Sequence, residues 1–116
     1  HTRYISVTGV QTCALPIYWT QAADWRFEPL DDEVFPAVEL ARRAGGQGGT
    51  APAVYNAANE VAVDAFHDGR IRFPEIVSTV ARVLDAHDVP SREHLTVDDV
   101  LAADAWARAG AAALIS

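Results

Sequence analysis

The sequence predicts a mainly α-helical protein: a small four-helix bundle preceded by an extended arm or short strand. Three observations carry this prediction. Apolar residues recur with the spacing of one helical face, residue types typical of helix starts and ends flank those stretches, and short breaks rich in glycine or proline separate them. About a hundred residues remain once an atypical first segment is set aside, which is enough for one small domain.

Residues 1–17 differ from the rest of the chain. They show no helical or alternating period, contain no acidic residue and hold the only cysteine, Cys13. The run 7–17 resembles the in-frame translation of a common sequencing-library adapter, whereas a signal peptide is disfavoured because Thr8 and Gln11 interrupt any apolar core. We therefore predict that residues 1–17 are an artefact rather than native sequence, and that removing them leaves the stability of the fold unchanged.

The segment 18–34 is predicted to be a linker or extended arm. From Trp25 to Pro29 the sequence alternates apolar and charged residues, the pattern of a short strand with one covered face. Trp25 and Phe27 would share that face. Because such a strand needs an outside partner, we expect both aromatic residues to pack against another domain.

A C-terminal helical domain is predicted over residues 35–116, beginning with a short helix at 37–44. Acidic residues at 31–33 precede this helix and two arginines lie near its end, which suits the helix dipole. The run 45–49, Gly-Gly-Gln-Gly-Gly, is predicted to be a flexible joint. A nucleotide-binding loop is disfavoured because this run follows a helix and the sequence contains no lysine.

One long amphipathic helix is predicted between Thr50 and Gly69. Thr50 is a residue type that caps helix N-termini, Pro52 is tolerated in a first turn, and Gly69 suits the position after a C-cap. One stripe of residues follows the helical period and must be buried: Val54, Tyr55, Ala58, Val61, Ala62, Ala65 and Phe66.

Two further helices complete the predicted bundle. One begins near Phe73 and ends before Pro90, and the other follows the N-cap residue Thr96 and runs to about Leu114. The apolar stripes are Ile76, Val77, Val80, Val83, Leu84 and His87 in the first, and Val100, Leu101, Ala105 and Trp106 in the second.

The polar residues Asn56, Asn59 and Glu60 lie beside the apolar stripe of the long helix. We expect them to pack against a neighbouring domain rather than to react. His67, at a helix end, is more typical of a partner for the helix dipole than of a catalytic base. His87 and His94 lack the spacing of metal ligands, and the aspartates near the last helix do not form a calcium loop. The sequence therefore predicts no catalytic, cofactor-binding or metal-binding residue.

The charge of the chain limits its partners. The formal net charge is −7, which disfavours nucleic acid and anionic membranes as partners. No apolar run approaches the ~20 residues of a membrane-spanning helix. Outside Cys13 there is no thiol for a disulfide, and we expect a cytoplasmic protein.

Several separated blocks between Trp19 and Ala113 resemble the C-terminal helical domain of the 1-deoxy-D-xylulose 5-phosphate reductoisomerase family. The blocks are Trp25-Arg26-Phe27-Glu28-Pro29-Leu30-Asp31, Phe35-Pro36-Ala37, Asn56-Ala57-Ala58-Asn59-Glu60, Gly69-Arg70-Ile71-Arg72-Phe73 and Thr96-Val97-Asp98-Asp99-Val100-Leu101.

The resemblance implies a parent enzyme of the non-mevalonate isoprenoid pathway. Members of the family use NADPH and a divalent metal ion, Mg²⁺ or Mn²⁺, to form 2-C-methyl-D-erythritol 4-phosphate, and they are homodimers. Their dinucleotide-binding and metal-binding domains precede the helical domain and have no counterpart in this sequence. The resemblance thus implies a fragment that binds neither NADPH nor metal, that is inactive alone, and whose partner is the missing catalytic domain.

Two other interpretations remain open from the residues alone. An independent acidic helical module that binds a protein partner is the first alternative. A small enzyme that uses His67 with a carboxylate is the second.

Overall fold

The computed structural model describes residues 17–88 and 92–116, so the prediction of an adapter-derived start lies, up to residue 16, outside the described residues. The described residues form four α-helices and one 3-10 turn. These are α2 (Ala37–Gln47), α3 (Ala51–His67), α4 (Phe73–Ala86), η2 (Arg92–His94) and α5 (Val97–Ile115). The predicted helical bundle is confirmed.

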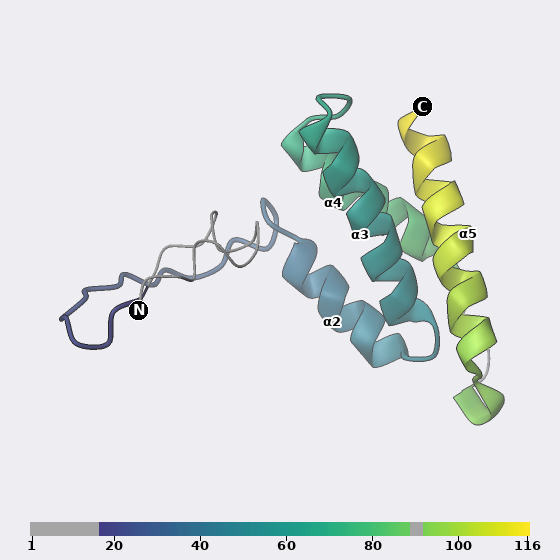
Figure 1. Cartoon of the computed structure of the whole chain (residues 1–116), viewed down its shortest axis with the longest axis horizontal. Coiled ribbons are helices and arrows are strands. Elements are labelled where there is room, and N and C mark those ends of the chain that lie inside the picture. Colours follow the sequence, from purple (N-terminus) through teal and green to yellow (C-terminus); the bar gives the residue numbers. More distant parts are fainter. Residues whose placement is uncertain (1–16, 89–91) are drawn as a thin grey trace.

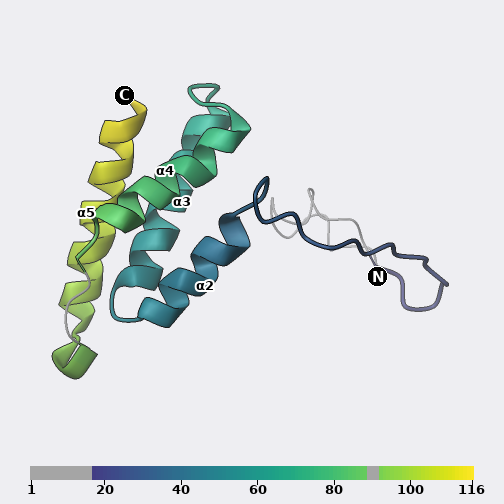
Figure 2. The same ribbon diagram turned by 180° about the vertical axis from the view of Figure 1, so that it is seen from behind.

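Helix α3 is the centre of the bundle, because it packs against each of the other three α-helices (Figures 1 and 2). The core around it is made of small residues. Alanine side chains allow helices to approach one another closely, toward the lower end of the usual ~8–10 Å between axes. The buried cluster consists of Ala44, Ala51, Val54, Ala57, Ala58, Val80, Val83, Leu84, Ala103, Ala107 and Ala111.

The end of α3 agrees with the sequence, but its start differs in one bond. Gly69 has a positive φ of 74°. Its N–H donates to the carbonyl of Phe66 and the N–H of Arg70 donates to the carbonyl of Ala65, and these are the two hydrogen bonds of a Schellman turn. At the other end Thr50 occupies the N-cap position, yet its side chain makes no capping hydrogen bond. The predicted N-cap position is therefore confirmed, and the hydroxyl contacts His87 instead of the helix N-terminus.

The predicted glycine-rich joint is shorter than expected. Helix α2 continues through Gly45, Gly46 and Gln47, and the turn into α3 is confined to Gly48 and Gly49, both with positive φ. The N–H of Gly48 still donates to the carbonyl of Ala44. Continuing the helix pairs backbone groups that a loop would leave to water, which outweighs the low helix propensity of glycine.

Helix α4 has the predicted start and buried stripe, with Thr79, Val80, Val83 and Leu84 buried. Helix α5 starts as predicted: Thr96 accepts a hydrogen bond from the N–H of Asp99, and the Asp99 carboxylate accepts one from the N–H of Thr96. The predicted stripe of α5 is wrong. Leu101 is 61% exposed, and the face that packs on α3 is Ala103, Ala107 and Ala111.

The segment before α2 is extended and lies off the bundle (Figures 1 and 2). Between residues 17 and 35 the structure contains no strand, and every side chain is exposed. The prediction of an extended arm is confirmed in this form. No helix of the described residues is long and apolar enough to cross a membrane.

Candidate docking surfaces

The arm carries its aromatic side chains on one side, as the alternation predicts. The ring centroids of Trp25 and Phe27 lie 6.4 Å apart, and the two side chains are 57% and 83% exposed. Between and beyond them, Arg26 pairs with Glu28 at 2.6 Å. The arm therefore presents an uncovered apolar edge opposite a charged one.

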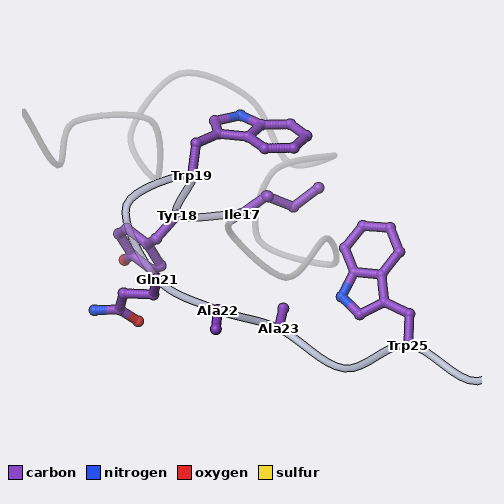
Figure 3. A pocket seen from close by; sticks show the side chains of 7 residues that line it. All are labelled: Ile17, Tyr18, Trp19, Gln21, Ala22, Ala23 and Trp25. Atoms are coloured by element: carbon purple, nitrogen blue, oxygen red, sulfur yellow. The ribbon is translucent and has the colours of Figure 1, made fainter.

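The arm also bends around a hollow of about 770 Å³ that extends from Ile17 to Trp25. Figure 3 shows the rings of Trp19 and Trp25 spaced along the arm, with Ala22 and Ala23 between them. Trp19 is 88% exposed. A ligand pocket buries most of its ligand between packed side chains, so this open bend of the chain does not have the form of a ligand-binding site.

Asn56 and Glu60 belong to a polar network that joins α3 to α5. The amide of Asn56 donates to Glu60 at 3.1 Å, and Arg108 donates to the same carboxylate at 2.6 Å and to Asp104 at 2.8 Å. These contacts hold the pKa of Glu60 below its ordinary value, first through the hydrogen bond from Arg108 and then through that from Asn56. The sequence analysis did not single out Arg108, although Arg108 follows Asp104 by four residues, which is the spacing of an ion pair within a helix.

Asn59 lies apart from Asn56 and Glu60. It lines an apolar groove of about 350 Å³ formed by α3, the start of α4 and the residues that lead into α2. Successive helical residues are rotated by about 100°, so Asn59 and Glu60 project in different directions. The structure therefore brings Asn56 and Glu60 together but places Asn59 on another side of α3.

Three helices meet at a second site that sequence reasoning did not assemble. The Thr50 hydroxyl lies 2.8 Å from Nε2 of His87, and the ring of Trp106 lies 5.3 Å from that of His87 between centroids. Thr50 is 1% exposed. Burial lowers the pKa of His87, and Asp88 opposes this effect. The sequence shows a threonine before α3 and a histidine on the stripe of α4. No sequence pattern indicates that these two residues contact each other.

Within the described residues, His67 has no partner that would make it a catalytic base. Its ring packs against that of Phe66 at 5.7 Å, and it makes no ion pair within the described part of the chain. The Phe66 ring is itself 36% exposed and contacts Phe73, so it lies at the edge of the buried stripe predicted for it. In residues 17–88 and 92–116 no group of three or more His, Cys, Asp or Glu side chains has the geometry to hold a metal ion.

Comparison with known proteins gives concordant matches. A family model described as "DXP reductoisomerase C-terminal domain" matches residues 5–110. The 1-deoxy-D-xylulose 5-phosphate reductoisomerase of Nocardia farcinica is 66% identical over 97 residues, which are 84% of this chain and 25% of that protein. The enzyme of the same name from Arthrobacter sp. is 60% identical over 100 residues, or 86% of this chain and 25% of that protein.

A solved structure agrees with these matches. The 1-deoxy-D-xylulose 5-phosphate reductoisomerase from Zymomonas mobilis, in complex with NADPH, matches with a TM-score of 0.66 and 38% sequence identity. The match covers 84% of this chain and 29% of that one. The chain therefore spans about a quarter of the length of the curated relatives it matches.

Proposed function

Because the chain belongs to the DXP reductoisomerase C-terminal domain family, we propose that it is the C-terminal structural domain of a 1-deoxy-D-xylulose 5-phosphate reductoisomerase. The family match over residues 5–110 is the observation that carries the proposal. The complete enzyme would use NADPH to rearrange and reduce its sugar phosphate to 2-C-methyl-D-erythritol 4-phosphate in isoprenoid biosynthesis. It would act as a cytoplasmic homodimer without nucleic acid or membrane partners.

The role of this domain is structural, and the chemistry belongs to the rest of the enzyme. A dinucleotide is normally held at the carboxyl ends of parallel strands, and residues 17–88 and 92–116 contain helices but no strand. The side chains of these residues do not fit the Mg²⁺ or Mn²⁺ of the parent enzyme, since no cluster of ligating groups is present among them. We therefore propose that NADPH and metal bind in other parts of the enzyme, and we expect the fragment alone to be inactive.

The exposed apolar edge of the arm supports a docking role toward those domains. Trp25 and Phe27 carry a large exposed apolar area on extended backbone, a combination that pairs readily with a sheet edge. Asn56 and Glu60, exposed beside Arg108, extend the proposed contact surface onto the bundle. In the isolated chain the arm has no such partner and promotes self-association.

A chimeric enzyme tests the proposed function. The C-terminal quarter of the Nocardia farcinica enzyme is replaced by residues 18–116, and NADPH oxidation is followed with 1-deoxy-D-xylulose 5-phosphate as substrate. We expect kcat/KM within about tenfold of the natural enzyme, while the same enzyme ending before the bundle loses activity. A chimera that is folded and inactive would contradict the proposal and favour an independent acidic interaction module.

Sedimentation of the isolated chain tests the docking role of the arm. We expect association that the pair Trp25→Asp and Phe27→Asp abolishes without changing the helical circular dichroism. In the chimera the same pair should lower stability and activity together. A monomeric wild-type fragment, or an unaffected chimera, would show that the arm is not a docking element.

A further inference from the structure

The groove beside Asn59 lies between two helix starts that each carry a Phe-Pro pair. Phe35-Pro36 immediately precedes α2, whereas Phe73-Pro74 forms the first two residues of α4, and both pairs line the groove. Helix α3 contributes Tyr55, Asn59 and Val63 to the same lining. Proline is favoured at helix starts because the N–H that it lacks would have no intrahelical acceptor there.

One polar side chain of the groove has no hydrogen-bond partner among the described residues. The Tyr55 hydroxyl donates to the carbonyl of Ala37 at 3.0 Å, so that hydroxyl already has an acceptor. Among the described residues, the side-chain amide of Asn59 makes no hydrogen bond, and the residue is partly buried. An amide both donates and accepts, which is the pattern that a main-chain peptide group complements.

The rim of the groove is apolar and uncovered. Val34 is 63% exposed, Phe35 54% and Phe73 62%. The volume of about 350 Å³ is near the lower end of the ~300–1,000 Å³ of ligand pockets. This size suits one or two apolar side chains of a peptide and is small for a dinucleotide.

The length of the relatives and the path of the chain indicate the occupant. The matched relatives are roughly three times as long as this chain, and the matching family model describes a C-terminal domain, so most of their polypeptide precedes the matched part. The arm ends at the groove itself, because Val34 and Phe35 form part of its wall. The ten residues from Trp25 to Val34 span at most roughly 30 Å, so whatever the arm docks on is held at high effective concentration next to the groove.

We propose that an extended segment of the preceding part of the same polypeptide occupies this groove. An apolar side chain of that segment lies between the two Phe-Pro pairs, and its main chain hydrogen-bonds to the Asn59 amide. The inference rests on the proposed function and deepens it, because it assigns Asn59 a contact distinct from the Asn56–Glu60 network.

Hydrogen exchange in the full-length chimera tests the groove. Pro74 has no N–H, and the N–H of Glu75 donates to the carbonyl of Arg72. The informative amides are therefore those of Ala37 and Val38 in α2 and of Phe73 in α4, which lack intrahelical acceptors and are protected only where something covers them. We expect Val34→Glu and Asn59→Ala to raise exchange at these amides by about tenfold or more, as for central contacts of an interface. Val97→Glu is the matched control for the first, since Val97 is also an exposed valine, and Asp64→Ala is the control for the second, since Asp64 is an exposed polar residue of α3 outside the groove.

Each outcome distinguishes one possibility. Exchange that rises with the two groove variants and not with the controls supports the docked segment. Exchange that is unchanged by the groove variants, or raised equally by the controls, overturns it, and protection that depends on protein concentration assigns the groove to a second copy instead. The activity of the chimera is read separately, so failure of the proposed function is not confused with failure of the groove.

Discussion

The core of the bundle contains small apolar residues, whereas the arm carries large aromatic ones. The buried core of the bundle consists of alanine, valine and one leucine, whereas every tryptophan and phenylalanine of the chain is at least 36% exposed. In most small domains the aromatic side chains supply much of the buried apolar area. Here they lie on the arm, in or beside the groove, and on α5, where Trp106 packs against His87.

This difference separates what folds the chain from what the chain contacts. Small residues close the bundle on α3 without help from the arm, while large exposed apolar patches mark surfaces for other proteins or domains. The comparison predicts that substitutions in the core change the stability of the isolated chain and that substitutions in the arm do not. The following changes test it, from the largest expected effect to the smallest.

Leu84→Ala should cause the largest loss. Leu84 is 2% exposed in the core cluster, and truncating such a leucine costs roughly 2–5 kcal/mol. Urea unfolding followed by circular dichroism measures the change. Trp25→Ala is the control in the arm and should stay within about 0.5 kcal/mol of the natural chain. Equal losses in the two variants would show that the arm belongs to the folded core.

Ala107→Leu should destabilise the chain by about 1–3 kcal/mol, because α5 approaches α3 through this fully buried alanine and extra methyl groups force the helices apart. Ala109→Leu makes the same change on the exposed side of α5 and should be nearly neutral. Thermal unfolding of the pair checks the assignment of the two faces. The reverse order would place the wrong face of α5 on α3.

Gly110→Ala should stabilise the chain by up to about 1 kcal/mol, the difference in helix propensity between the two residues. A Cβ atom at this position would meet Val83 at 4.0 Å, an ordinary van der Waals contact. Gly69→Ala is the contrasting change and should destabilise the chain, because the backbone φ of 74° at Gly69 is strained for any residue that has a side chain. Melting temperatures that fall for both variants would mean that the α4–α5 contact has no room for a methyl group.

Acid should weaken the bundle through His87, and we expect the smallest effect here. Burial lowers the pKa of His87 in the folded chain, so the unfolded chain binds more protons as the pH falls below the ordinary histidine value of 6.5. Stability is therefore fully present above that pH and is lost on going down toward the folded-state pKa. His87→Gln should flatten the slope of unfolding free energy between about pH 7 and 5. An unchanged slope would show that the pH dependence of stability comes from groups other than His87.

The sequence predicted the helices better than it predicted their faces. Gly69 and Thr96 ended and began helices as expected, because a positive-φ turn and a capping box each depend on a few neighbouring residues. The buried face of α5 was wrong because that helix is apolar nearly all round, and alanines on several sides give no contrast. Gly45 and Gly46 were assigned to a loop although backbone pairing keeps them helical.

In the candidate surfaces, too, features set by neighbouring residues were predicted and contacts between distant residues were not. The arm was recognised because alternation is local, and its exposed aromatic edge followed from Trp25 and Phe27 alone. The contacts of Glu60 with Arg108 and of Thr50 with His87 join residues 48 and 37 positions apart, so only the packing of three helices brings them together. The inter-domain roles of Asn56, Asn59 and Glu60 stay predictions.

The alanine contact between α3 and α5 leaves one question of register that alanine itself does not answer. Ala103, Ala107 and Ala111 repeat every four residues, so sliding α5 by four residues, about 6 Å, would fill two of these three places with alanine again and bring Asp99 or Ile115 to the third. Arg108 contributes to the choice of alignment. One slide would bring Asp104 opposite Glu60 and set two carboxylates against each other, and the opposite slide would offer Glu60 only Ala112. A surface ion pair of small energetic value thus favours the same alignment of α5 as the two residues, Asp99 and Ile115, that bound its alanine stripe.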